Sequence, residues 1–176
     1  MTHEIALSAP WIEGREEELV LEVLRSGRLS LGPMVDRFER ALAEHVAAPH
    51  VAAVSSGTAG LHLSVRLAGI GPGDEVVTTP FSFVASSNCV LYEGGTPVFA
   101  DVDPNTLNLD PPAVEAAITP RTKAIVVVHI FGYPADLPAF ERLGLLSATR
   151  ALGNSHASVS LDWESSGTAG VLLAFF

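Results

Sequence analysis

The chain has 176 residues, of which 48% are apolar and 17% charged, and its formal net charge is -10. This length fits one domain with a sizeable core, and the composition excludes a disordered chain. The acidic balance argues against a surface for nucleic acid or an anionic membrane, because both need clustered Lys and Arg. Cys89 is the single cysteine, so no disulfide framework, zinc cluster or other metal site is expected.

The sequence shows neither a secretion signal nor a membrane span, and this bears on the expected compartment. Residues 1–14 contain no basic region followed by an apolar run, which argues against a secretion signal. No segment is long and apolar enough to cross a membrane. A lone cysteine is typical of a reducing compartment. We therefore expect a cytoplasmic protein without membrane contact.

Two amphipathic helices are predicted first, from Gly14 to a stop at Gly27 and from Pro33 to Val46, because apolar residues recur there at helical spacing. The pattern then changes to short valine-rich runs that predict buried parallel strands at residues 50–55, 74–79, 96–101 and 123–129. Helical stretches lie between them, at residues 59–67, 86–92 and 112–118. This alternation predicts an α/β fold with a mostly parallel sheet and flanking helices.

The segment after Phe140 is harder to interpret. A helix begins near Leu137, but no valine-rich strand follows at the expected place. Helices average roughly eleven residues and strands about five, so residues 137–147 hardly leave room for both. We expect an irregular or damaged α/β unit there.

The hexapeptide SSGTAG occurs twice, at residues 55–60 and 165–170. The first copy follows a predicted strand and opens a predicted helix, so backbone N–H groups and the positive helix end converge on one spot that suits a phosphate. The second copy runs into the strand-like VLLAFF and offers no helix start. We predict phosphate binding at the first copy and a turn at the second. An ordinary capped helix start is the alternative for the first.

Further candidates follow the other predicted strands. Phe83 and Asn88 come after the second strand and His129 closes the fourth, which places them at the carboxyl edge of the sheet, where ligands usually bind. Either Phe81 or Phe83 is suited to stack on a planar ring, and we expect Phe81 to be a core aromatic. A histidine in this position fits a structural or a catalytic role.

Three ordered segments, residues 24–45, 54–111 and 122–137, resemble the DegT/DnrJ/EryC1/StrS family of pyridoxal-phosphate-dependent aminotransferases. The resemblance runs from about Ile5 to Leu143. It implies the large domain of the type I aminotransferase fold, a homodimer with active sites at the interface, glutamate as amino donor and a nucleotide-linked keto sugar as acceptor. Residues 144–176 diverge from the family pattern, and the resemblance leads us to expect that these 176 residues hold part of the cofactor-binding domain and not the family's small C-terminal domain.

The resemblance also assigns residues to the cofactor, pyridoxal 5'-phosphate. Ser56, Gly57 and Thr58 match the loop that holds its phosphate, and Phe83 matches the aromatic that stacks on its pyridine ring. Asn88 and His129 fall in family motifs near the cofactor. In addition, Gly32 lies in a stretch that commonly borders the substrate or the partner subunit.

Two departures concern the catalytic groups. The cofactor needs a lysine that forms a Schiff base and a carboxylate at the pyridine nitrogen. Lys123 is the only lysine and matches a solvated position before a strand, so the family's lysine is expected just beyond Phe176. Ser147 occupies the place of the carboxylate, and nothing around Asp162 supports it as a substitute. No catalytic residue is assigned.

Two hypotheses remain open. The chain is an enzyme that transfers an amino group from glutamate to a keto sugar nucleotide, or it is a non-catalytic or regulatory truncated family member. A dinucleotide-binding domain is disfavoured because no GxGxxG follows the first strand.

Overall fold

The computed structural model describes residues 10–143, 146–151, 158–162 and 171–175, and it divides into two compact units between Phe38 and Glu39. The first unit holds α1 (Gly14–Ser26) and the start of α2 (Pro33–Val46). Glu13 and Glu16 form a capping box at the start of α1, and Gly27 ends the helix with φ 67°. Both predicted helices are confirmed. No helix among the described residues has the length and apolar character of a membrane span.

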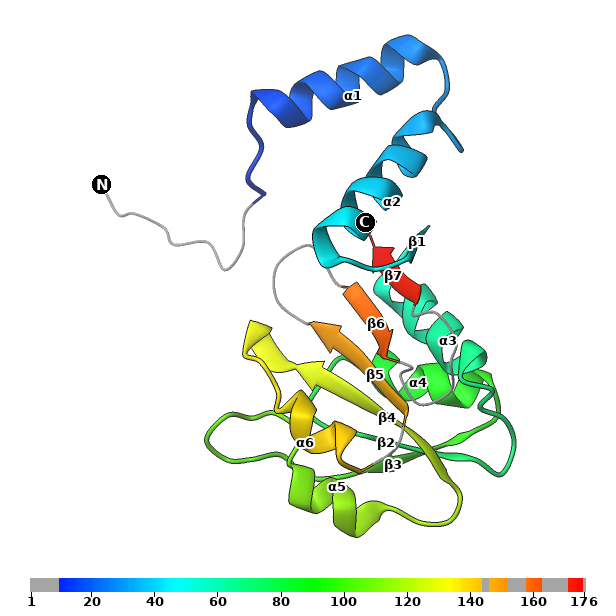
Figure 1. Cartoon of the computed structure of the whole chain (residues 1–176), viewed down its shortest axis with the longest axis vertical. Helices are drawn as coiled ribbons and strands as arrows, with labels where there is room; N and C mark the ends of the chain where they lie inside the picture. The colour runs from blue at the N-terminus through cyan, green and yellow to red at the C-terminus, as the bar shows by residue number, and fades with distance from the viewer. Residues whose placement is uncertain (1–9, 144–145, 152–157, 163–170, 176) are drawn as a thin grey trace. The chain divides into compact units, whose positions relative to one another are not determined.

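The second unit alternates strands and helices as predicted (Figure 1). Its strands and helices, in chain order, are β1 (His50–Val54), α3 (Gly57–Leu67), β2 (Glu75–Thr78), α4 (Ala85–Tyr92), β3 (Thr96–Phe99), α5 (Pro111–Ala117), β4 (Thr122–His129), the 3-10 turn η1 (Ile130–Gly132), α6 (Leu137–Glu141), β5 (Leu146–Ala151), β6 (Ser158–Asp162) and β7 (Val171–Phe175).

Within the described residues the strands form one sheet in the order β1-β7-β6-β5-β4-β2-β3. Every neighbouring pair is parallel except the two pairs that contain β6. Strand β6 runs opposite to both of its neighbours, β5 and β7, so β7 and its parallel partner β1 run in the same direction as β2, β3, β4 and β5. Their carboxyl ends therefore lie along one edge of the sheet, as expected.

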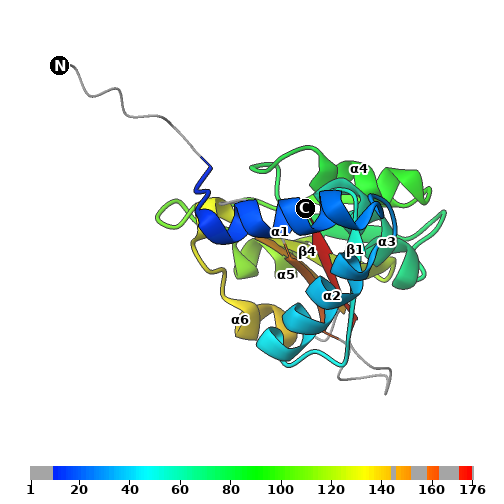
Figure 2. The same cartoon turned by 90° about the horizontal axis from the view of Figure 1, so that it is seen from above.

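The strand β4 is buried on both faces, and side-chain alternation along it separates two cores. Ala124 and Val126 pack in a cluster with residues of α3 and α4, whereas Ile125 and Val127 pack in a second cluster with residues of α5 and α6. In Figure 2, α4 and α6 accordingly lie on opposite sides of β4. The sheet is thus covered by helices on both faces.

The expectation of an irregular unit after Phe140 is wrong for the described residues. Helix α6 has only five residues, and β5 follows it and pairs in parallel with β4 from Ala124 to His129. A shorter helix than average makes room for the strand. The sequence of β5, LSATRA, is not valine-rich, so the backbone pairing with β4 reveals the strand where the composition does not.

Candidate functional site at the carboxyl edge of the sheet

The first SSGTAG copy forms the junction between β1 and α3, as predicted. Ser56 is the N-cap of α3: its backbone is extended and its Oγ accepts a hydrogen bond from Ala59 N–H at 3.1 Å. The helix begins at Gly57, two residues earlier than the sequence predicts. The second copy lies outside the described residues, so its predicted turn stays a prediction.

At this junction two backbone N–H groups are available to bind a ligand. The N–H groups of Ala59 and Gly60 bond to the side chain and carbonyl of Ser56, at 3.1 Å each. The N–H groups of Gly57 and Thr58 make no hydrogen bond to any residue that the structure describes. Two adjacent unpaired donors at the positive end of an eleven-residue helix are the arrangement that binds phosphate. The geometry therefore fits a cofactor phosphate.

The loop after β2 places aromatic rings at the same edge. The Phe83 side chain is 59% exposed, two residues before α4 begins, and Asn88 lies half-buried within α4. The expectation that Phe81 is a core aromatic is wrong, because its side chain is 43% exposed. Its ring instead meets Phe131, in the loop after β4, edge to face at 6.2 Å. Proximity to an apolar strand did not make Phe81 a core residue, because β2 ends at Thr78 and Phe81 lies in the bend that follows.

His129 is the last residue of β4, as predicted, and its ring is held by the loop that follows. Ala135 N–H donates to His129 Nδ1 at 2.9 Å. Because Nδ1 accepts this bond, the proton of the neutral ring lies on Nε2. Partial burial disfavours the imidazolium ion and lowers the pKa of His129 below its ordinary value of 6.5.

The predicted site residues share one edge but not one face of the sheet. The Ser56–Thr58 loop and Asn88 belong to α3 and α4, whose residues pack with Ala124 and Val126. His129 follows Ile125 and Val127 in the alternation of β4, on the face covered by α5 and α6. No contact among the described residues joins His129 to the Ser56–Thr58 loop. The helix start and the Phe83 loop therefore make up the core of the candidate site, and His129 lies beside it.

Three residues were considered from the sequence for the lysine and carboxylate roles. Lys123 is exposed near the start of β4, six residues before His129, so its Cα lies roughly 20 Å from the carboxyl edge at about 3.3 Å per residue. Ser147 pairs with Ile125, and Asp162 stands opposite Ser147 in β6. The backbones of Ser147 and Asp162 therefore also lie away from that edge, level with the middle of β4.

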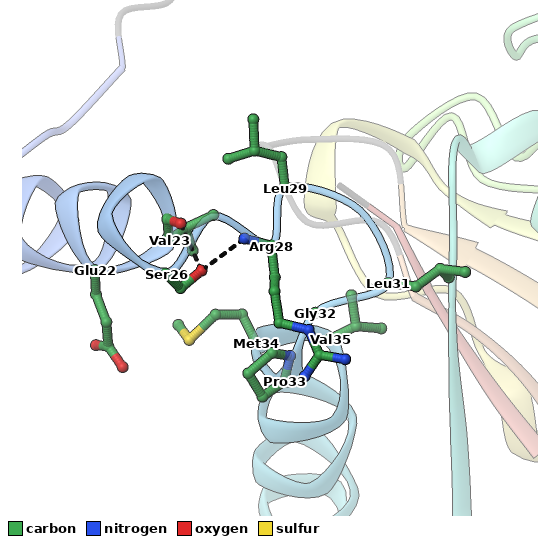
Figure 3. Close-up of a pocket in the computed structure, with 10 residues that line it drawn as sticks. All are labelled: Glu22, Val23, Ser26, Arg28, Leu29, Leu31, Gly32, Pro33, Met34 and Val35. Atoms are coloured by element: carbon green, nitrogen blue, oxygen red, sulfur yellow. Dashed lines mark hydrogen bonds between the residues drawn. The ribbon is translucent and has the colours of Figure 1, made fainter.

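Gly32 lies in the first unit, in a small cavity of about 110 Å³ between the end of α1 and the start of α2 (Figure 3). Ser26 Oγ donates to Val23 O at 2.7 Å and accepts from Arg28 N–H at 3.1 Å, which fixes the turn. A Cβ at Gly32 would lie 2.9 Å from the carbonyl oxygen of Arg28. Only glycine fits here without a backbone shift, so the predicted importance of Gly32 has a local packing reason.

Comparison with known proteins identifies the family. The profile of the DegT/DnrJ/EryC1/StrS aminotransferase family matches residues 10–146. The chain belongs to this family. It is 50% identical over 137 residues to the spore coat polysaccharide biosynthesis protein SpsC of Bacillus subtilis (strain 168), which is 78% of this chain and 35% of that protein. It is 44% identical over 134 residues to GDP-perosamine synthase of Caulobacter vibrioides, at 76% and 36% coverage.

The crystal structure of a DegT/DnrJ/EryC1/StrS aminotransferase from Brucella abortus has the same fold, with a TM-score of 0.71 at 36% identity over 76% of this chain and 39% of that chain. The crystal structure of NtdA from Bacillus subtilis with bound cofactor PMP matches with a TM-score of 0.74 at 30% identity, over 91% of this chain and 42% of that chain. The predicted fold class, an α/β aminotransferase sheet, is confirmed. The chain spans about a third of the length of the curated relatives that it matches.

Two residues at this edge were missed from the sequence. Phe131 has a left-handed backbone, with φ 50°, and a 76% exposed ring. Asn108, in the loop after β3, is only 4% exposed and donates to two carbonyl groups of the loop after β4. Both residues lie within the segments that resemble the family, but no local pattern distinguishes either one, and the run DPNTLNL around Asn108 resembles a polar turn. Only its burial distinguishes it.

The ring of His129 predicts a pH-dependent stability. Its folded-state pKa is lowered, so its contribution is fully present above the unfolded pKa near 6.5 and is lost as pH falls toward the folded value. His129→Asn keeps an acceptor in place of Nδ1 but does not titrate in this range. We expect the free energy of unfolding to fall less between pH 7.5 and 5 in this variant than in the wild type, measured by urea denaturation.

The same substitution at His50, an exposed residue at the start of β1, is the matched control. It should leave the wild-type pH dependence between pH 7.5 and 5 in place. An equal pH dependence in wild type and His129→Asn would show that this ring is not the group responsible.

Proposed function

We propose that this chain is the cofactor-binding part of a pyridoxal-phosphate-dependent aminotransferase that moves an amino group from glutamate to a nucleotide-linked keto sugar. The observation that carries the proposal is the Ser56-capped start of α3, where the N–H groups of Gly57 and Thr58 lack partners among the described residues. Relatives named for spore coat polysaccharide biosynthesis and for GDP-perosamine synthesis support a sugar substrate. A similar structure with bound PMP supports the cofactor.

Each residue has a distinct part in this proposal. The Gly57 and Thr58 N–H groups and the Thr58 hydroxyl bind the cofactor phosphate, while Ser56 holds the helix start in place. The exposed Phe83 ring stacks on the pyridine ring. Asn88 and His129 flank the cofactor and bind its polar atoms or those of the substrate. The bound cofactor supplies the electron sink for amino-group chemistry.

Among the described residues, neither Lys123 nor Asp162 is placed to serve as the Schiff-base or pyridine-nitrogen group. The only lysine, Lys123, lies near the opposite end of β4 from the site, and Ser147 is level with the middle of the sheet. We infer that the chain binds pyridoxal phosphate without a covalent link. The alternative of a non-catalytic or regulatory family member rests on this same feature, and it shares the cofactor site with the enzyme hypothesis.

If the first copy binds the cofactor phosphate, the same substitution in the two hexapeptide copies should change the affinity for pyridoxal phosphate differently. Thr58→Val removes a hydroxyl that bonds to the phosphate but keeps the shape of the side chain. Hydrogen bonds to charged groups contribute about 1.5–3 kcal/mol, so we expect pyridoxal phosphate to bind roughly tenfold to a hundredfold more weakly. Isothermal titration calorimetry of the full chain measures the affinity.

Thr168→Val makes the same change in the second copy and is the matched control, with affinity expected to equal that of the wild type. Weaker binding in Thr168→Val with unchanged binding in Thr58→Val would reverse the assignment of the two copies and remove the basis of the proposed function.

The position of Lys123 predicts that pyridoxal phosphate does not label the chain covalently. The protein is incubated with the cofactor, treated with borohydride and digested, and the peptides are analysed by mass spectrometry. We expect no stoichiometric label on Lys123, because its exposed side chain lies far from the phosphate loop. A defined visible absorbance band that disappears in Lys123→Arg, together with full labelling of Lys123, would overturn the inference.

We further propose that the chain forms a homodimer through residues 27–38 and 80–92. Both segments expose large apolar side chains, including Leu29 at 70% and Tyr92 at 55%. Light scattering at micromolar concentration should give twice the chain mass of 18.5 kDa. Leu29→Glu should shift the protein toward monomer, whereas Leu67→Glu, at a 54% exposed position outside both segments, should not. A soluble wild-type monomer would contradict this interface.

A further inference from the structure

The loop after β4, residues 130–136, connects the carboxyl ends of three neighbouring strands. On one side its Phe131 ring meets Phe81 of the loop after β2. On the other side it meets Asn108 of the loop after β3. Its Ala135 N–H also holds the ring of His129. The conformation of this one loop therefore decides how both Phe131 and His129 are presented at the candidate site.

The Asn108 side chain is the main polar anchor of this loop. Its Oδ1 accepts from Ile130 N–H at 3.0 Å, and its Nδ2 donates to Tyr133 O at 3.1 Å and to Pro134 O at 3.2 Å. The side chain is 4% exposed, so water does not replace these bonds. One amide thus spans the loop from its first residue to the residue before Ala135.

Asn108 is itself held rigidly by its own loop. Its carbonyl accepts from Asp103 N–H at 2.9 Å, and its N–H donates to Thr106 Oγ1 at 3.3 Å. The next residue, Leu109, forms an antiparallel bridge with Val102. These contacts hold the backbone at Asn108 in place. The side-chain amide therefore holds the loop after β4 in a matching position.

The loop needs such an anchor because one of its residues is strained. Phe131 has φ 50° and ψ 25°, a left-handed conformation that a bulky side chain adopts only when its surroundings impose it. The hydrogen bonds of Asn108 enclose Phe131 from both sides, at Ile130 and at Tyr133. Without them, the backbone would relax and the exposed ring would leave Phe81.

We propose that Asn108 is a positioning residue of the site, which fixes the loop after β4 so that His129 keeps its proton on Nε2 and Phe131 stands against Phe81. In this arrangement Nε2–H has no partner among the described residues and serves as a donor to an oxygen atom of a ligand, beside an exposed aromatic pair. That ligand is the cofactor or substrate of the proposed function, on which this part of the inference rests. The positioning itself rests on the contacts above.

The test uses Asn108→Asp in the full chain with no cofactor added. The carboxylate has the same shape and keeps the acceptor for Ile130 N–H, but it cannot donate to Tyr133 O or Pro134 O. We expect hydrogen exchange at the Ala135 amide to become at least tenfold faster, while exchange at the Ala68 amide, bonded to Ser64 O at 2.9 Å in α3, stays unchanged. The pKa of His129, measured by NMR in Asn108→Ser, which adds no charge near the ring, should rise toward 6.5 as the ring becomes more exposed.

Asn105→Asp is the matched control, since Asn105 is an exposed residue of the same loop whose side chain makes no hydrogen bond to any described residue. It should change neither readout. If Asn108→Asp does not fold, Asn108→Ser gives both measurements. Uniformly faster exchange at Ala68 and Ala135, or an unchanged Ala135 amide and His129 pKa, would reduce Asn108 to a purely structural residue.

This outcome is independent of the phosphate loop. If Thr168→Val binds pyridoxal phosphate more weakly and Thr58→Val binds it as well as wild type, the proposed function loses its basis, yet the Asn108 variants still report on His129. Conversely, an unchanged His129 pKa in Asn108→Ser would overturn the positioning role and leave cofactor binding at α3 in place.

Discussion

The burial of β4 on both faces is the constraint on which the rest of the second unit depends. A strand covered on both faces needs apolar side chains at successive positions, and residues 124–128 are all buried. The alternation of the strand sends Ala124 and Val126 to the helices α3 and α4, and Ile125 and Val127 to α5 and α6. Helices on both faces need crossover connections, and such connections make neighbouring strands parallel. The burial of β4 thus fits the common direction of β2, β3, β4 and β5, whereas β6 runs the opposite way.

Parallel strands bring their carboxyl ends to one edge, but they do not determine how the loops at that edge touch. That arrangement depends on a few specific contacts: the T-shaped pair of Phe81 and Phe131, the three hydrogen bonds of Asn108, and the bond from Ala135 N–H to His129. Each contact joins residues from different loops or from the two ends of one loop. The site therefore has two parts, a helix start that is local to α3 and a loop cluster that depends on long-range contacts.

Sequence reasoning succeeded where a structure depends on neighbouring residues. The strand, the serine cap and the helix around Ser56 are contiguous, so the loop between β1 and α3 could be predicted together with its helix. It failed where pairing or exposure depends on distant residues. The strand β5 is recognisable by its hydrogen bonds to β4 rather than by its residues, and Phe81 leaves the core because the chain turns after β2. Those errors share one physical cause, since neither sheet pairing nor chain direction is a local property.

The sequence by itself determined the α/β class, the two N-terminal helices, the loop and helix start at Ser56–Thr58 and the family to which the chain belongs. Hydrophobic periodicity, capping residues and turn residues act over a few positions and can be recognised directly. Only the tertiary structure decided which nitrogen of His129 carries the proton, why Phe131 adopts a left-handed backbone and what the buried amide of Asn108 does. Asn108 and Ile130 are separated by 22 residues in the chain. A hydrogen bond across that separation exists only after the sheet has brought the two loops to the same edge.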